Sequence, residues 1–222
     1  MLLAVDTSTT WIGLALYDGV RVLGEMTWQS QNHHTVELSP GVQEIIDRCG
    51  VHKTDLQALA VATGPGSFTS LRIGLALVKG MALALRIPVV GVPTLDILAA
   101  AQPAQDVQLA ALLQAGRGRL AVGWYDLSDG VWKARGGPQV TNAEELVLKL
   151  NKPTLVVGEM SAAERQVLAR RRKNAIMVSP ANSLRRPSYL AEIAWERWRA
   201  GQVDEVVSLS PIYLHVAEAV PA

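Results

Sequence analysis

Two short polar loops carry the residues of this chain that could take part in chemistry. The first follows an apolar run near the N-terminus and contains Asp6, Thr7 and Ser8. A carboxylate beside hydroxyls and backbone N–H groups, at a turn between strands, can hold hydrated Mg²⁺ and a phosphate. The same residue types also form ordinary hydrogen-bonded turns, which is their more frequent role. The sequence leaves both roles open.

The second loop, Gly64-Pro65-Gly66-Ser67, lies between a short apolar run and a long one. Its proline fixes one φ between two glycines that can adopt positive φ, so a tight turn is expected. Ser67 or Thr69 would cap the following helix, whose free N–H groups then point back toward the glycines. The loop therefore suits an anion or a close neighbour, although it lacks the spacing of Walker and dinucleotide-binding loops.

The helix expected from Ser70 to Arg86 is apolar nearly all round. Before its last residue its only charges are Arg72 and Lys79, seven positions apart on one stripe. A helix that packs only on its own core needs apolar residues over part of its circumference. We therefore expect two buried faces, with Ala76 and Gly80 allowing a close approach; burial of both faces inside one domain is the open alternative. A membrane span is disfavoured because the charges interrupt the apolar run.

Arg72 falls in the first turn of this helix, where a cation opposes the helix dipole at a cost of about 0.3–1 kcal/mol. A carboxylate or phosphate partner is therefore expected. An intramolecular Asp or Glu, or solvent alone, is the simpler alternative.

Composition indicates a globular protein with one substantial core or two small domains. The 222 residues are 49% hydrophobic and the net charge is +1, so no bulk field draws the chain to nucleic acid or lipid. The basic runs Arg170–Lys173 and Arg185-Arg186 are interpreted as solvated, with local RNA or phosphate contact as the alternative. Cys49 is the only cysteine, which excludes an internal disulfide framework, and the N-terminus lacks a secretory pattern. A cytoplasmic location is expected.

Strands and helices alternate along the first hundred residues. Strands are predicted at Leu2–Val5, Trp11–Tyr17, Val20–Trp28, Ala58–Thr63 and Pro88–Val92, and helices at Thr35–Cys49, Ser70–Arg86 and Thr94–Ala101. Asp18-Gly19 is a hairpin signal, and Thr35 or Ser39 is the expected N-cap of the first helix. Such alternation predicts a mixed α/β sheet with parallel members and helices on its faces.

The second half repeats this alternation less clearly, after a candidate boundary at Gln102–Gln105. Strands are predicted at Val107–Leu113, Leu120–Tyr125, near Val131 and at Thr154–Val157, helices at Asn142–Leu150, Ser161–Arg172 and Pro187–Ala200, and a short closing element at Pro211–Leu214. No internal repeat is visible.

The first loop is similar to the metal and phosphate hairpin of the actin-like ATPase superfamily, whose nucleotide cleft lies between two related halves. Such a cleft needs a second phosphate hairpin and a glycine-rich nucleoside loop. The second half offers only Asp129-Gly130 and Val157-Gly158-Glu159, neither of which has that form. The sequence thus predicts an incomplete cleft.

A set of motifs gives a closer resemblance. They are Asp6-Thr7-Ser8, His34-Thr35, Ala62-x-Gly-Pro-Gly-Ser-Phe-Thr-x-x-Arg72-Ile73-Gly74, Lys79-Gly80, Pro88-Val89-x-Gly91-Val92 and Pro211-x-Tyr213-Leu214. In them the chain resembles the TsaB (YeaZ) family, which bacteria require for threonylcarbamoyladenosine in transfer RNA. The resemblance is dense over residues 1–100 and thin afterwards. Ser70 replaces a usual glycine, and Gln114–Arg119 departs from the family's Asp-Ala-Arg, which puts contacts of that loop in doubt.

The resemblance implies an actin-like ATPase (ASKHA, ribonuclease H-like) fold with two subdomains. Residues 1–102 would form the first, with residues 187–222 packing back on it, and residues 103–186 a smaller, degenerate second. The family member is the non-catalytic partner of the paralogue TsaD, which carries a metal-binding His-x-x-x-His motif. Here His33 and His34 are adjacent and His52 is remote, so neither a metal site nor a peptidase constellation is predicted.

The resemblance also implies partners. The two helices at Thr35–Cys49 and Ser70–Arg86 would bind TsaD, or a second copy of the chain in isolation, with further contact to the ATPase TsaE and only weak or indirect contact to tRNA. The predicted partner-binding residues are His34, Leu38, Val42, Ile45, Arg72, Ile73, Ala76, Leu77, Lys79, Gly80 and Met81. The vestigial nucleotide or phosphate residues would be Asp6, Thr7, Ser8, Gly64, Gly66 and Ser67. No cofactor is required, and weak binding of ATP or ADP with Mg²⁺ is left open.

The leading hypothesis is therefore a non-catalytic scaffold that binds and activates TsaD for threonylcarbamoyl transfer to the adenosine next to the anticodon. The alternative is a stand-alone actin-like hydrolase or kinase that uses Asp6 and the Gly64 loop.

Overall fold

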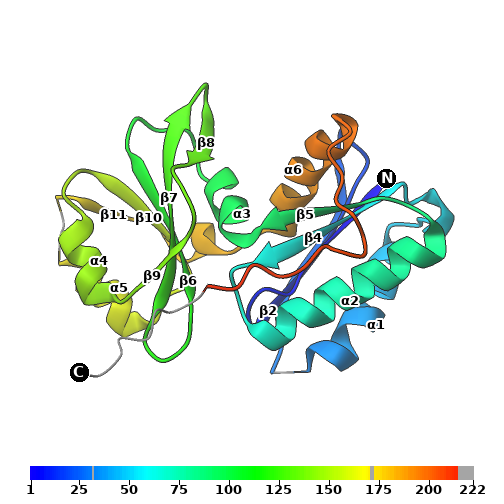
Figure 1. The fold of residues 1–222 in the computed structure, drawn as a ribbon, viewed down its shortest axis with the longest axis horizontal. Coiled ribbons are helices and arrows are strands. Elements are labelled where there is room, and N and C mark those ends of the chain that lie inside the picture. The colour runs from blue at the N-terminus through cyan, green and yellow to red at the C-terminus, as the bar shows by residue number, and fades with distance from the viewer. Residues whose placement is uncertain (32, 171–172, 215–222) are drawn as a thin grey trace.

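The computed structural model describes residues 1–31, 33–170 and 173–214. It contains two mixed β-sheets with helices on their faces, and the α3 helix lies between the sheets (Figure 1).

The first sheet has the strand order β3-β2-β1-β4-β5. Its strands are β1 (Leu2–Asp6), β2 (Trp11–Tyr17), β3 (Val22–Gln29), β4 (Ala58–Gly64) and β5 (Val89–Pro93). β1 is antiparallel to β2 and parallel to β4. Every residue of β1 and β4 is buried, as their continuous apolar sequences predict for strands covered on both faces.

The second sheet repeats this arrangement. Its strands are β6 (Gln108–Gln114), β7 (Leu120–Ser128), β8 (Val131–Ala134), β9 (Gln139–Thr141), β10 (Thr154–Gly158) and β11 (Ala175–Met177). The order β8-β7-β6-β10-β11, with an antiparallel β6–β7 pair and a parallel β6–β10 pair, matches the first sheet strand for strand. The two halves therefore share a strand order although no repeat is visible in the sequence. Different apolar residues can form the same pattern of strand pairing, so a shared topology does not require similar residues.

Helices cover both faces of the first sheet. The α1 helix (His34–Arg48) and α2 (Phe68–Leu85) pack on one face, and α6 (Pro187–Arg199) packs on the other. The remaining helices are α3 (Thr94–Ala100), α4 (Ala143–Lys149), α5 (Ala162–Ala169) and two 3₁₀ turns at Lys53–Asp55 and Ala181–Ser183. The predicted division into domains at residues 102 and 186 stays a prediction.

Some elements were missed and some boundaries were wrong, for identifiable reasons. The strands β9 and β11 were not predicted, because three residues are too few for a recognisable pattern. β3 begins at Val22 because the Asp18 carboxylate accepts hydrogen bonds from the N–H groups of Val20 and Arg21 and so extends the turn. The α1 helix begins at His34 with His33 as N-cap, and no side chain caps it.

The segment at Pro211–Leu214 was predicted as a closing element, and it forms neither helix nor strand. It nevertheless lies against the end of β4, where the Ile212 N–H donates to the Thr63 carbonyl oxygen at 2.7 Å.

The α3 helix joins the two cores. Leu95 and Leu98 pack with the second sheet, whereas Ile97 packs with the first. The Tyr125 hydroxyl on β7 donates to Asp96 Oδ1 at 2.6 Å, and burial raises the pKa of Asp96 above its usual range.

We expect Asp96→Asn to increase the free energy of unfolding at pH 7, because it removes a buried charge and keeps an acceptor for Tyr125. The raised pKa means that folded Asp96 takes up its proton before the unfolded chain does. The gain over the unaltered protein should therefore shrink as the pH falls through the folded pKa of Asp96 toward the unfolded value. Urea denaturation at several pH values measures this, and a gain that stays constant with pH would contradict it.

Among the described residues, the 18-residue helix Phe68–Leu85 is the one long and apolar enough to cross a membrane by length and composition. One such helix is weak evidence for a span, and Leu71, Leu75 and Val78 of this helix are buried against the first sheet.

Candidate functional site

The two predicted loops meet at the carboxyl end of the first sheet. Asp6 ends β1, and the Ser67 N–H at the start of α2 donates to the Ser8 carbonyl oxygen at 2.7 Å. A Cβ on Gly66 would lie 2.9 Å from the Ser8 carbonyl carbon and nearer still to its oxygen. Only glycine fits there, so the Gly-Pro-Gly turn allows a close approach of two backbone segments.

The hydroxyl groups of the first loop bond within the protein. Thr7 Oγ1 donates to the Ser70 carbonyl oxygen at 2.7 Å, and Ser8 Oγ lies 2.8 Å from Thr94 Oγ1. Thr94 Oγ1 also accepts from the Gly64 N–H at 3.0 Å. All of these groups are buried. The loop thus ties β1, β4, α2 and α3 together.

A buried arginine holds the Asp6 carboxylate. Arg185 Nε donates to Asp6 Oδ2 at 2.8 Å, and Arg185 Nη2 donates to Thr9 Oγ1 at 3.0 Å. Arg185 Nη1 is also paired with Glu159 Oε1 at the end of β10. We call these four residues the Arg185 cluster. It links the first sheet, the second sheet and the segment before α6.

Electrostatics keep the Arg185 guanidinium charged. Burial acts to lower the pKa of Arg185, but the carboxylates of Asp6 and Glu159 outweigh it and raise the pKa above its usual value. The other Asp6 oxygen, Oδ1, accepts the Ser8 N–H at 2.8 Å. Both Asp6 oxygens therefore already have partners. Asp6 thus serves as the counter-ion of a buried guanidinium, and this ion pair competes with any contact of the carboxylate to hydrated Mg²⁺.

Across residues 1–31, 33–170 and 173–214, no group of three or more His, Cys, Asp or Glu side chains is arranged to hold a metal ion.

The Arg185-Arg186 run was interpreted as solvated, and for Arg185 this was wrong. Its side chain is 2% exposed, whereas that of Arg186 is 54% exposed and pairs with Glu25. Nothing near Arg185 in the sequence could have revealed its role, because Asp6 lies 179 residues away.

A cavity of about 790 Å³ opens between the two halves beside the start of α2. Of the six predicted nucleotide residues, Gly66 and Ser67 line it. The β6–β7 turn lines it from the second sheet with Gln114 and Arg119. This turn corresponds, in the repeated topology, to the turn after Asp6, and β6 ends in an amide where β1 ends in a carboxylate. The second half therefore has a hairpin at the equivalent place, but this hairpin lacks the acidic residue that a metal and phosphate hairpin needs.

The outer side of α2 is open. Arg72, Ala76 and Gly80 are exposed, and nothing lies within 4 Å of a Cβ placed on Gly80. The predicted residues Ile73, Leu77, Lys79 and Met81 are half-buried along the same helix. One face of α2 is thus buried within the chain, while Ala76 and Gly80 lie on a face that another molecule could approach.

Arg72 pairs with aromatic residues inside the chain, and its predicted carboxylate or phosphate partner stays a prediction for a ligand or another protein. Its Nε donates to the Tyr213 hydroxyl at 2.9 Å, and its guanidinium lies 3.8 Å from the centre of the Phe68 ring. Within the described part of the chain no carboxylate pairs with it. Lys79 likewise donates to the Val207 carbonyl oxygen at 3.1 Å. The C-terminal segment therefore positions both charges of α2.

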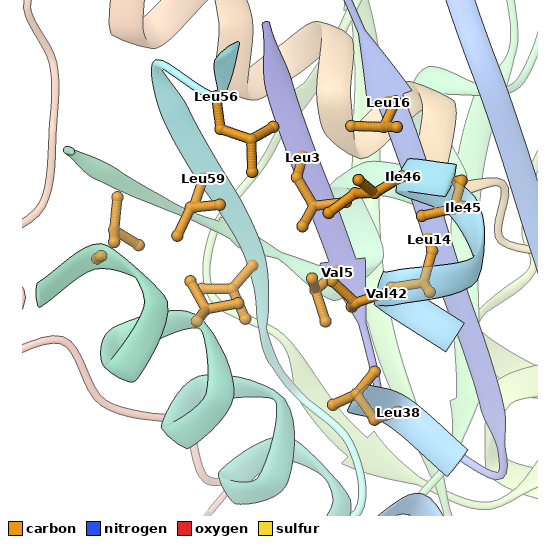
Figure 2. Packing of buried hydrophobic residues seen from close by; sticks show 14 of the residues in the cluster. Leu3, Val5, Leu14, Leu16, Leu38, Val42, Ile45, Ile46, Leu56 and Leu59 are labelled. Atoms are coloured by element: carbon orange, nitrogen blue, oxygen red, sulfur yellow. The ribbon is translucent and has the colours of Figure 1, made fainter. Parts of the chain in front are cut away.

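The predicted partner-binding residues of α1 need correction. Leu38, Val42 and Ile45 are at most 5% exposed and point toward the first sheet (Figure 2). His34 is buried, with Nε2 2.9 Å from the Thr9 carbonyl oxygen. Their helical spacing marks the core face of α1, so these side chains have almost no surface to offer a partner.

Comparisons with known proteins show which family the chain belongs to. A family model described as tRNA N6-adenosine threonylcarbamoyltransferase (TsaD) matches residues 22–194. The tRNA threonylcarbamoyladenosine biosynthesis protein TsaB of Bacillus subtilis is 30% identical over 222 residues, which cover 98% of this chain and 95% of that protein. The chain belongs to the TsaB (YeaZ) family.

Solved structures agree with this assignment. YeaZ from Pseudomonas aeruginosa matches with a TM-score of 0.80 and 28% identity, over 96% of this chain and 99% of that chain. The activator of the 2-hydroxyisocaproyl-CoA dehydratase from Clostridium difficile, with bound ADPNP, matches with a TM-score of 0.51 and 11% identity over 92% of this chain and 98% of that chain. That likeness shows the fold alone. The TsaB family member described here thus has the predicted two-halved actin-like (ASKHA) fold.

Proposed function

We propose that this TsaB family member is a non-catalytic scaffold that binds TsaD through the outer face of α2 and activates it. In this proposal TsaD transfers the threonylcarbamoyl group to the adenosine beside the anticodon of tRNAs that read codons starting with A. The membership of the family, whose curated relatives are named for tRNA threonylcarbamoyladenosine biosynthesis, supports a role in that process.

The observation that carries the proposal is the open face of α2. Ala76 and Gly80 lie one helical turn apart on this face, and their small side chains let a partner backbone come close. The half-buried Ile73, Leu77 and Met81 beside them add apolar area that a partner could cover. A TsaD paralogue with a related fold could present a similar helix here. In isolation a second copy of the chain would use the same face, giving a homodimer.

The Arg185 cluster supports the non-catalytic part of the proposal. A hydrolase or kinase that used Asp6 would need its carboxylate free for Mg²⁺, whereas here the carboxylate neutralises a buried guanidinium. We propose that contact with the ATPase TsaE is a second interaction of the scaffold and that no cofactor is required.

Gly80→Arg should reduce TsaD capture at least a hundredfold, because an arginine side chain would occupy the space through which the partner approaches. The fold should stay intact, since position 80 has nothing within 4 Å. Purified TsaD on affinity resin, with the bound fraction quantified against protein concentration, measures the effect.

Ala163→Arg is the matched control, because it places the same side chain at an exposed position of α5 on the other sheet. It should bind TsaD like the unaltered protein. Equal TsaD capture by Gly80→Arg and Ala163→Arg, at unchanged thermal stability, would overturn docking on α2.

A further inference from the structure

A hollow of about 510 Å³ on the second sheet is lined by an aromatic ring and by cationic groups. Its lining residues are Gln108, Trp124, Arg135, Lys149, Asn151 and Lys152. They come from β6, β7, the end of β8 and the end of α4, so four separate segments build it. It shares no lining residue with the cavity beside α2.

Arg135 is held in place at this hollow. Its Nε and Nη2 donate to the two Asp126 carboxylate oxygens at 2.8 and 2.5 Å. The Gln108 amide oxygen, in the orientation that satisfies both groups, accepts from Arg135 Nη2 at 2.8 Å. The guanidinium is therefore oriented, and 47% of its side chain stays exposed. An oriented, exposed guanidinium is suited to contact a phosphate.

More cations gather around the hollow. Asn174 Nδ2 donates to the Leu150 carbonyl oxygen at 2.7 Å, which brings Asn174 against the turn after α4. Lys173 precedes Asn174 and is exposed. Among the described residues, Arg135, Lys149 and Lys152 line the hollow, and Lys173 is the sequence neighbour of Asn174. Of the acidic residues at this end of the sheet, Asp126 is paired with Arg135, and Asp129 is paired with Lys133.

This imbalance stands out in a chain whose net charge is only +1. A lysine at a helix C-terminus can also serve the helix dipole, and that accounts for Lys149 alone. It accounts neither for Arg135, which comes from a strand, nor for the half-buried Trp124 between the charges. Cations that flank an aromatic ring are the chemistry that binds RNA, because phosphates pair with the cations and a base stacks on the ring.

We propose that this hollow is an RNA-binding surface. The phosphate backbone lies across Arg135, Lys149 and Lys152, and one unpaired base stacks against Trp124. The inference rests on the proposed function in one respect, which is that the RNA would be a tRNA. The strands and the helix that build this surface belong to the second sheet and α4, whereas α1 and α2 cover the first sheet (Figure 1), so RNA and a protein partner could bind together.

The double variant Lys149→Gln, Lys152→Gln tests the phosphate contacts. Binding of a fluorescently labelled unmodified tRNA transcript is measured by anisotropy from 20 to 200 mM KCl, with the chain alone and with TsaD. We expect the slope of log K against log salt to decrease in magnitude by roughly 1.5 to 2, since each lost phosphate contact removes about one unit. The control Lys53→Gln, Arg199→Gln removes two exposed charges from the other half and should leave the slope unchanged.

Trp124→Leu tests the stacking contact and should weaken tRNA binding roughly five- to a hundredfold, whereas Trp124→Phe keeps an aromatic face and most of the affinity. Thermal denaturation of each variant checks the fold. Equal tRNA affinity of the lysine variant and its control overturns the proposal, as does the absence of tRNA binding by the unaltered protein with and without TsaD. TsaD capture by the same variants reports separately on docking at α2, and its loss would contradict that function instead.

Discussion

Arg185→Met should lower the free energy of unfolding by about 3–5 kcal/mol, which is the usual cost of removing one partner from a buried ion cluster. The substitution leaves the carboxylates of Asp6 and Glu159 without their shared cation, and Asp6 is 2% exposed. Methionine has nearly the length of arginine, so the loss reflects charge more than volume. For a chain of this size the melting temperature should fall by roughly 6 to 20 °C. Urea denaturation and calorimetry measure both quantities.

Arg186→Met provides the control next door. It removes the same charge from an ion pair with Glu25, but its side chain is 54% exposed, so the change should be within about 1 kcal/mol. Similar losses for the two variants would mean that the Arg185 cluster contributes no more than a surface pair.

Arg185→Met also distinguishes a scaffold from a nucleotide hydrolase. In the unaltered protein Arg185 occupies the Asp6 carboxylate, so Mg²⁺ and ATP should not raise its melting temperature. Arg185→Met frees this carboxylate, so any rise in melting temperature with Mg²⁺ and ATP should be larger in the variant. Strong stabilisation or turnover by the unaltered protein, lost in Asp6→Ala, would favour the hydrolase or kinase.

Gly66→Ala should destabilise the protein by about 1–3 kcal/mol or more, because the new methyl group overlaps the Ser8 carbonyl group. The atoms that the methyl group would meet belong to the Ser8 backbone, which cannot rotate away as a side chain could. Separation of the segments would also weaken the hydrogen bond from the Ser67 N–H to the Ser8 carbonyl oxygen. Chemical denaturation gives the loss directly.

Gly80→Ala is the matched substitution at an open helical site, where nothing lies within 4 Å. It should stabilise the protein by about 0.5–1 kcal/mol, since alanine has the higher helix propensity. If Gly66→Ala and Gly80→Ala changed the free energy of unfolding in the same direction, the close approach of Ser8 would not be what requires glycine at position 66.

The central part of the fold was predictable because its signals are local. β2 was predicted with both ends correct, and the Ser67 cap was one of two candidates, since these depend on residues adjacent in sequence. The side of α1 that faces the core was visible in its spacing, yet Leu38, Val42 and Ile45 were assigned to a partner. Periodicity shows that a face is apolar without showing what covers it.

The site was less predictable because it depends on distant residues. Asp6 looked suited to Mg²⁺ until Arg185, far along the chain, was found against it. Gln114 gave no sign that it ends the strand equivalent to β1. A run of basic residues is visible in the sequence at Arg170–Lys173, whereas Arg135 and Trp124 of the proposed RNA-binding surface come together only through the pairing of strands. Arg171 and Arg172 of that run lie outside the described residues.

The position of α6 affects how the protein folds during synthesis. Leu190, Ala191 and Ala194 are fully buried against the face of the first sheet that includes Leu2 and Ala4. The ribosome makes this helix after the whole second sheet, so the half that is synthesised first stays uncovered on one face until translation is nearly complete. A ribosome stalled before residue 187 should therefore carry an N-terminal half that proteases still digest.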